Sequence, residues 1–331
     1  ANAAFTGGRI FKIEPGTEPV TLYAKFEKGK FIKYDDNFTT YLNGLTPSEE
    51  PYRIVFQAEG FKGGEDSGFS RELNAALKTN KNIKLKVDLN EARGWRVDSF
   101  MFDDCDHVVG ITFGKRIEDI DYKELDKMHL EEIVINPDNE KYDSRDNCNG
   151  IIETSSNKML FASKNITIPS SVTTLASSLF YGRTDITEFT VPDHITELGE
   201  FLFKNCTELT KVVLPLALKK ISNYAFSGCS KLETVRFSGV HYSDDPSTDE
   251  FPFDTGIVLL EEIGACAFYD CIALNDFSLP LHVKTIGDSA FYNCWNLNKI
   301  TIGNKVEYIG TNAFFNSSIC SFILFIKFNE L

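Results

Sequence analysis

Two stretches of the chain decide its fold: EIGACAFYDCIALNDFSLP (Glu262–Pro280) and TIGDSAFYNCWNLNKITIG (Thr285–Gly303). The second repeats the first 23 positions later, and four further stretches keep the same phase. This phase is marked by one phenylalanine in each copy, called the anchor here: Phe180, Phe203, Phe226, Phe268, Phe291 and Phe314. Consecutive anchors lie 23 residues apart, except for one gap of 42 residues, which is one repeat plus a 19-residue insertion.

Other columns of the repeat keep register with the anchors. An Ile or Leu precedes each anchor by five positions, and a Cys follows most of them by three: Cys206, Cys229, Cys271 and Cys294. Each unit also has one short strand in which apolar and polar residues alternate, and a Pro or Gly that ends this strand. A short segment then leads the chain back to the start of the next strand. A single unit cannot bury its apolar side, whereas stacked units bury a continuous core. The period therefore predicts a solenoid with a parallel sheet along one face and stacked phenylalanine rings in its core.

The repeat pattern I-x-[IL]-P-x-x-[VL]-x-x-[IL]-G-x-x-A-F-x-x-C-x-x-L resembles the BspA-like leucine-rich-repeat family of bacterial surface proteins. The segment NPDNEKYDSRDNCNGIIETSSNKMLFASKNITIP, which starts at Asn136, resembles a hairpin-bearing variant of that repeat. The resemblance covers roughly residues 81–331. It implies an α/β-type solenoid of right-handed leucine-rich-repeat coils with a parallel sheet on one face. It also implies a protein that is exported to or displayed on the cell surface and works by binding.

The repeat decays toward the N-terminus. Phe102 and Cys105 still reproduce the anchor and the cysteine, but residues 1–80 show no 23-residue phase. We expect a small β-rich region there, and the apolar spacing across Phe69–Lys78 predicts a helix that caps the first coil. The predicted organisation is thus an N-terminal region over 1–80 and a solenoid over 81–331, with insertions near 137–165 and 238–256. Because the chain starts at Ala1 without a leader pattern, we expect a signal peptide to have been removed or left out.

Composition and motifs restrict the classes of function. The chain has 34 basic and 48 acidic residues, a net charge of −14, which disfavours a nucleic-acid or anionic-membrane partner. No apolar run approaches the roughly 18 residues that a membrane-spanning helix needs. The five histidines are dispersed, and no phosphate-loop, hydrolase or C-x-x-C motif occurs. The sequence therefore predicts no catalytic residue, no metal and no cofactor.

The cysteine column allows two interpretations. Neighbouring coils lie about 4.8 Å apart, which is within the range that a disulfide tolerates, so Cys206 with Cys229 or Cys271 with Cys294 are candidate pairs. However, parallel side chains in a ladder do not point at each other, and Arg183 and Ser317 fill the same slot without a partner. We therefore favour a ladder of buried free thiols that act as small hydrophobes.

The insertions suggest where a ligand would bind. Both follow a strand at the same repeat phase, so we expect both on one rim, beside the outward positions of the strands. The 19-residue insertion carries the only dense cluster of acidic residues, next to aromatic ones; it fits no EF-hand spacing, and a solvated acidic loop is the plainer interpretation. The candidate binding residues are Glu188, Thr190, Lys211, Thr234, Arg236, Tyr242, Asp244, Asp249, Phe251, Phe253, Asp276 and Lys299.

The leading hypothesis is a non-enzymatic cell-surface or secreted protein that mediates adhesion through its solenoid face. Its partner would be a protein of a host or neighbouring cell, or a component of the extracellular matrix. Two alternatives remain open: a glycan-binding or glycan-acting protein that uses the acidic and aromatic insertion, and an architectural spacer without a specific ligand. A solvated sheet face also needs polar residues, so the outward strand positions do not by themselves separate these hypotheses.

Overall fold

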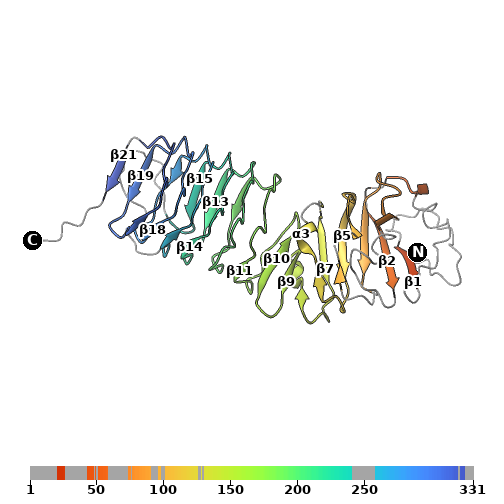
Figure 1. Cartoon of the computed structure of the whole chain (residues 1–331). Helices are drawn as coiled ribbons and strands as arrows, with labels where there is room; N and C mark the ends of the chain where they lie inside the picture. Colours follow the sequence, from red (N-terminus) through yellow and green to blue (C-terminus); the bar gives the residue numbers. More distant parts are fainter. Residues whose placement is uncertain are drawn as a thin grey trace, which may run out of the picture. The chain divides into compact units, whose positions relative to one another are not determined.

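A computed structural model of the chain shows a parallel β-solenoid (Figure 1). Two compact units divide the chain: the first is 1–156 with 160–169, and the second is 157–159 with 170–331. The structure describes residues 21–26, 43–47, 49, 51–58, 74–75, 77–90, 96–97, 101–125, 128, 130–240, 258–319 and 321–324.

The first unit contains a five-stranded parallel sheet. Its strands, in spatial order, are β1 (Thr21–Phe26), β2 (Tyr52–Ala58), β3 (Leu85–Leu89), β5 (Val108–Phe113) and β7 (Glu132–Ile135). Two shorter strands, β4 (Arg96–Val97) and β6 (Asp119–Ile120), pair in parallel elsewhere in the same coils. Ile54 and Leu77 lie in the same hydrophobic core as the later strands. Strands β2 and β3, which lie on either side of residue 80 in the sequence, thus belong to one sheet with a shared core, and the boundary near residue 80 stays a prediction.

An antiparallel hairpin follows β7. It consists of β8 (Tyr142–Asp143) and β9 (Gly150–Glu153), with a 3-10 turn, η2 (Arg145–Asn147), between them. The hairpin confirms the variant repeat expected in this segment. Strand β10 (Lys158–Ala162) comes next, and its first two residues pair in parallel with β11 (Thr174–Leu175) inside the second unit.

In the second unit most coils contribute two parallel strands. The longer strands form a sheet of β12 (Glu188–Thr190), β13 (Lys211–Leu214), β15 (Thr234–Phe237) and β17 (Asp276–Phe277). The two-residue strands form another sheet of β14 (Lys220–Ile221), β16 (Glu262–Ile263), β18 (Thr285–Ile286) and β20 (Tyr308–Ile309). A separate pair consists of β19 (Lys299–Ile302) and β21 (Ser321–Leu324). In Figure 1 these strands lie side by side, coil after coil, from green to blue.

The anchor phenylalanines fill the core between these sheets. Each ring stacks on the anchor of the next coil, with centroids 5.0–5.4 Å apart and planes within 15° of each other. Phe180 through Phe291 are completely buried. The stacked core predicted from the period is thus confirmed.

The return segments are tight turns. Two residues in each coil have a positive φ, one two positions before the anchor and one two positions after it. The later of the two is always Gly, Asn or Asp, the residues that adopt this backbone region most readily: Gly182, Asn205, Gly228, Asp270, Asn293 and Asn316. A helix cannot pass through such positions.

The α/β assignment is not confirmed for the described part of the chain. There, the helical structure includes η2 and one short helix, α3 (Tyr122–Leu125), both in the first unit, and left-handed residues interrupt every return segment of the second unit. The predicted capping helix over Phe69–Lys78 lies largely outside the described residues. The Lys78 N–H donates to the Asn74 carbonyl at 3.0 Å, a bond with helical spacing, and the full helix stays a prediction.

Candidate functional site

The outward positions of β12, β13 and β15 form a polar surface, called the strand face here. Cα pairing aligns Glu188, Lys211 and Thr234 in one row across the sheet, and Thr190, Val213 and Arg236 in a second row. The intervening residues of β13 and β15 are buried, so all six aligned side chains belong to the solvent side. The structure thus brings together five of the predicted binding residues on a rigid parallel sheet.

Both signs of charge meet on the strand face. The Lys211 ammonium lies 4.0 Å from the nearer carboxylate oxygen of Glu188, and both side chains are largely exposed. Such an exposed pair contributes at most about 1 kcal/mol to stability, so its charges remain available to a partner. Since the buried alternate residues fix the backbone, the surface is held in place without help from a ligand.

The remaining predicted residues are distributed differently. Tyr242, Asp244, Asp249, Phe251 and Phe253 lie outside the described residues. Asp276 is the first residue of β17 and pairs with Thr234, so its backbone continues the first row. Lys299 begins β19, which pairs with β21 in a separate sheet. The described ends of the two insertions follow β7 and β15 directly, as expected, and their common rim stays a prediction.

A second feature, missed by sequence reasoning, is an open hollow of about 1060 Å³ in the first unit. It is lined by the turn after β5 and by the start of the hairpin: Lys115, Arg116, Ile117, Glu118, Asp119, Asp138, Asn139, Glu140, Lys141 and Ser155. Three basic and four acidic side chains line it, so its charge favours neither an anion nor a cation strongly. The only signal in the sequence was the density of charged residues in two short segments.

Asn139 holds the two walls of the hollow together. Its buried side-chain amide donates to the carbonyl oxygens of Gly114 at 3.0 Å and Ile117 at 2.9 Å. The Asn139 Oδ1 atom accepts from the backbone N–H groups of Lys141 and Tyr142, both at 2.9 Å. All of its hydrogen-bonding capacity is therefore used by backbone groups, which makes Asn139 a structural clamp.

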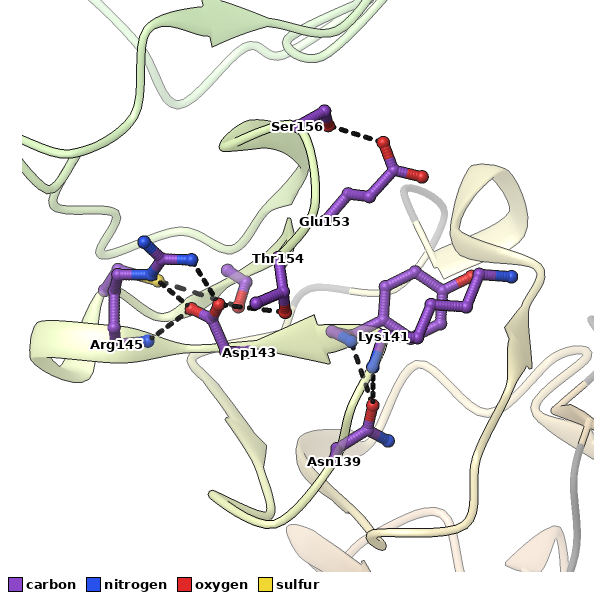
Figure 2. Close-up of polar contacts among 10 residues, drawn as sticks. Asn139, Lys141, Asp143, Arg145, Glu153, Thr154 and Ser156 are labelled. Atoms are coloured by element: carbon purple, nitrogen blue, oxygen red, sulfur yellow. Dashed lines mark hydrogen bonds and ion pairs between the residues drawn. The ribbon is translucent and has the colours of Figure 1, made fainter.

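The hairpin beside the hollow is braced by a compact ionic network. In Figure 2, Asp143 lies between the guanidinium group of Arg145 and the hydroxyl group of Thr154. The Arg145 Nε atom donates to Asp143 at 2.7 Å and its Nη2 atom to the second carboxylate oxygen, while Thr154 donates at 3.2 Å. The carboxylate is thus engaged on both oxygens, and the network stabilises the hairpin.

The cysteine column consists of free thiols. All seven cysteines of the described segments are unpaired, so neither of the candidate disulfides forms. Each thiol of the ladder instead donates to the carbonyl oxygen of the anchor in the preceding coil, as Cys206 does to Phe180 at 2.8 Å and Cys294 to Phe268 at 3.1 Å. Burial raises the pKa of the Cys206 and Cys294 thiols to about 12. Thiols of such high pKa are poor nucleophiles at neutral pH.

Within the described residues, no group of three or more His, Cys, Asp or Glu side chains has the arrangement of a metal site. No helix in that part of the chain is both long and apolar enough to span a bilayer.

Comparisons with known proteins place the chain among repeat proteins. The model of the BspA type leucine rich repeat region matches six copies, over residues 150–245 and 257–331. No curated protein matches the chain. A leucine-rich repeat protein from Eubacterium ventriosum has a similar solved structure, at 20% identity and a TM-score of 0.50, over 81% of this chain and 77% of that one.

Two further solved structures share less of the geometry. A leucine rich cell surface protein from Faecalibacterium prausnitzii is 19% identical, with a TM-score of 0.46, over 80% of this chain and 76% of that one. The pneumococcal vaccine antigen PcpA is 14% identical, with a TM-score of 0.46, over 81% of this chain and 72% of that one. Because the six matched copies cover more than half of the residues and coincide with the coils described above, the chain belongs to the BspA-type leucine-rich-repeat family.

Proposed function

We propose that this protein is a non-enzymatic, exported binding protein of a bacterial surface, which engages a protein ligand through the strand face. The ligand would belong to a host cell, a neighbouring cell or the extracellular matrix. Membership of the family indicates a binding or adhesion role, and one protein with a similar solved structure carries the description of a cell surface protein.

One observation carries the proposal: two rows of outward side chains lie in register on a backbone fixed from below. Such a surface needs no ordering when a partner binds, so little conformational entropy is lost. Its mixture of Glu188, Lys211, Arg236 and threonines suits a polar protein surface of mixed charge. Affinity would come from many modest contacts, with the charges guiding orientation and the rate of association.

The test reverses two charges of the strand face. The double variant Lys211→Glu/Arg236→Glu and the unaltered chain would be compared by surface plasmon resonance on immobilised fibronectin, laminin, fibrinogen and collagen. We expect binding to at least one of these proteins, and at least about tenfold weaker binding by the double variant, because like charges at an interface cost several kcal/mol.

A matched control is available outside the strand face. Lys231 pairs with Glu208 at 2.7 Å between adjacent coils, so Lys231→Glu also removes an exposed cation from an intercoil pair. This control should bind like the unaltered chain. Equal binding by the double variant and the control would contradict the strand face as the binding surface, and so would the absence of binding to all four proteins.

A further inference from the structure

The last coils of the second unit carry a partly exposed aromatic column on their turns. One position after the anchor stand Tyr269, Tyr292 and Phe315, whose rings stack at 4.8 Å and 5.1 Å. Phe315 is 55% exposed. The same position is Tyr181, Lys204 and Ser227 in the earlier coils, so the fold does not require an aromatic ring there. The column is therefore a local property of the last three coils.

A ladder of amides runs next to this column along the chain. The Asn316 Nδ2 atom donates to Asn293 Oδ1 at 2.8 Å, and the Asn293 Nδ2 atom donates to Asp270 Oδ1 at 2.7 Å. All three residues have a positive φ, which fixes their backbone at the bend of each turn. Each amide has a second N–H group, and Asp270 has a second oxygen. The ladder thus has N–H donors and a carboxylate oxygen that its own hydrogen bonds do not use and that a ligand could bind.

Trp295 adds an open aromatic face two positions after Asn293. Its side chain is 53% exposed, and no aromatic ring of the described residues stacks on it. Ile272 occupies the same position of the preceding coil and is 37% exposed, and the Asn296 N–H donates to its carbonyl at 3.2 Å. In the earlier coils this position is Thr207 or Ser230. A large apolar side chain is thus placed where the repeat elsewhere has a small polar one.

We propose that Tyr269, Asp270, Tyr292, Asn293, Trp295 and Phe315, called the tryptophan patch here, bind a neutral oligosaccharide. A sugar ring presents an apolar C–H face and an edge of hydroxyl groups. The open indole of Trp295 matches the C–H face, and the amide ladder matches the hydroxyl groups. Tyr292 is stacked between Tyr269 and Phe315, so both of its faces are occupied, and it supports the patch rather than serving as the stacking surface.

The composition of the patch distinguishes this ligand from others. An apolar helix laid across it would bury the amide ladder without partners, and a buried polar group without a partner disfavours binding. The patch contains the carboxylate of Asp270 and no Lys or Arg, so a sulfated or carboxylated glycan would be repelled. A neutral sugar chain satisfies the amides and meets no charge of its own sign.

The experiment follows Trp295 in the full chain. The chain has two tryptophans, so a Trp95→Phe background leaves Trp295 as the single reporter. Its fluorescence would be titrated with cellohexaose, xylohexaose and mannohexaose, and with a heparin hexasaccharide as the anionic comparison. We expect saturable binding of at least one neutral hexasaccharide and none of heparin.

Variants then locate the binding by calorimetry. Trp295→Ala should bind at least about tenfold more weakly, which corresponds to a loss of about 1.4 kcal/mol. Tyr181→Ala is the matched control, since Tyr181 is an aromatic residue of similar exposure (47%) that stands three coils before Tyr269, outside the patch; it should bind normally. Urea unfolding would verify that both variants are folded.

The results that would overturn the proposal are equally definite. They are the absence of neutral-hexasaccharide binding at millimolar concentration, undiminished binding by Trp295→Ala, or equal binding of heparin. The strand-face variant Lys211→Glu/Arg236→Glu should leave sugar binding unchanged, so this surface and the proposed function can fail independently.

Discussion

The two units of the molecule solve the same packing problem by different means. In the second unit, coils in exact register repeat one set of contacts: anchor on anchor, and thiol on the carbonyl of the preceding anchor. In the first unit, single polar side chains fix individual turns. Asn139 binds four backbone groups, and the buried His107 ring contacts the Leu77 carbonyl at 2.9 Å.

The difference shows what strict register provides. Where coils stack in register, one favourable contact is multiplied, and each coil is stabilised by its neighbours on both sides. The ladder continues even across the 19-residue insertion, where Phe226 stacks on Phe268 and the Cys271 thiol donates to the Phe226 carbonyl. Where the repeat itself becomes irregular, each turn needs its own hydrogen-bonding partner for buried backbone groups. The comparison predicts where substitutions lower the free energy of unfolding most. In the second unit these are interior positions of the ladder, and in the first unit they are single polar residues such as Asn139.

The largest effect is expected for Phe226→Ala. The Phe226 ring is completely buried and stacks on Phe203 at 5.4 Å and on Phe268 at 5.3 Å. Its removal should lower the free energy of unfolding by about 3–5 kcal/mol, because a cavity is left between two rings. Urea unfolding of this variant and of the unaltered chain would measure the loss.

Phe314→Ala is the matched substitution at the last anchor. Its ring stacks on Phe291 at 5.3 Å and is only partly buried, so the loss should be clearly smaller than for Phe226→Ala. Equal losses would show that burial within the ladder does not set the size of the loss, and the contrast between the units would lose its main support.

Alkaline pH should weaken the second unit through its thiols. The folded pKa of Cys206 is about 12, above the ordinary value of 9.0, so its stabilising contribution is complete below pH 9 and is lost as pH rises toward 12. The loss is about 1.4 kcal/mol per pH unit for one thiol, or about 4 kcal/mol over the window. Free energies of unfolding measured from pH 8 to pH 11 would show this slope.

Cys206→Ser tests whether ionisation of the Cys206 thiol causes this loss. A serine hydroxyl group can still donate to the Phe180 carbonyl but does not titrate in this range. The variant's free energy of unfolding should fall less steeply with pH than that of the unaltered chain. Identical slopes would contradict thiol ionisation as the cause.

The same contrast explains how far the sequence could predict the structure. The anchors, the cysteines and the strand face follow from spacing alone, because each recurs in register and its copies must stack. The disulfide alternative fails on geometry, since the ladder thiols point at backbone carbonyls. The hollow and Asn139 could not be predicted, because they depend on where a single turn meets a single hairpin. The aromatic residues of the tryptophan patch are visible in the sequence, one and four positions after the anchors. Only their exposure in the structure distinguishes them from core residues.

The smallest of these effects tests the first unit directly. Asn139→Ala removes two donors to the turn after β5 and the acceptor that orders the start of the hairpin. At about 1 kcal/mol for each net hydrogen bond, and with carbonyls left unsatisfied, we expect a loss of about 2–4 kcal/mol. Asn136→Ala is the control: its amide donates to Asn90 and accepts from the Asp138 N–H, both on the surface, so it should cost less than about 1 kcal/mol.

Hydrogen exchange would show where the loss falls. Asn139→Ala should increase exchange of the Lys141 and Tyr142 amides, which lose their acceptor, and of the turn at 114–117. The thiol ladder of the second unit should keep its protection, because its contacts repeat independently of this clamp. If Asn136→Ala were as damaging as Asn139→Ala, or if exchange rose equally in the ladder coils, then single polar clamps would not be what holds the irregular coils together.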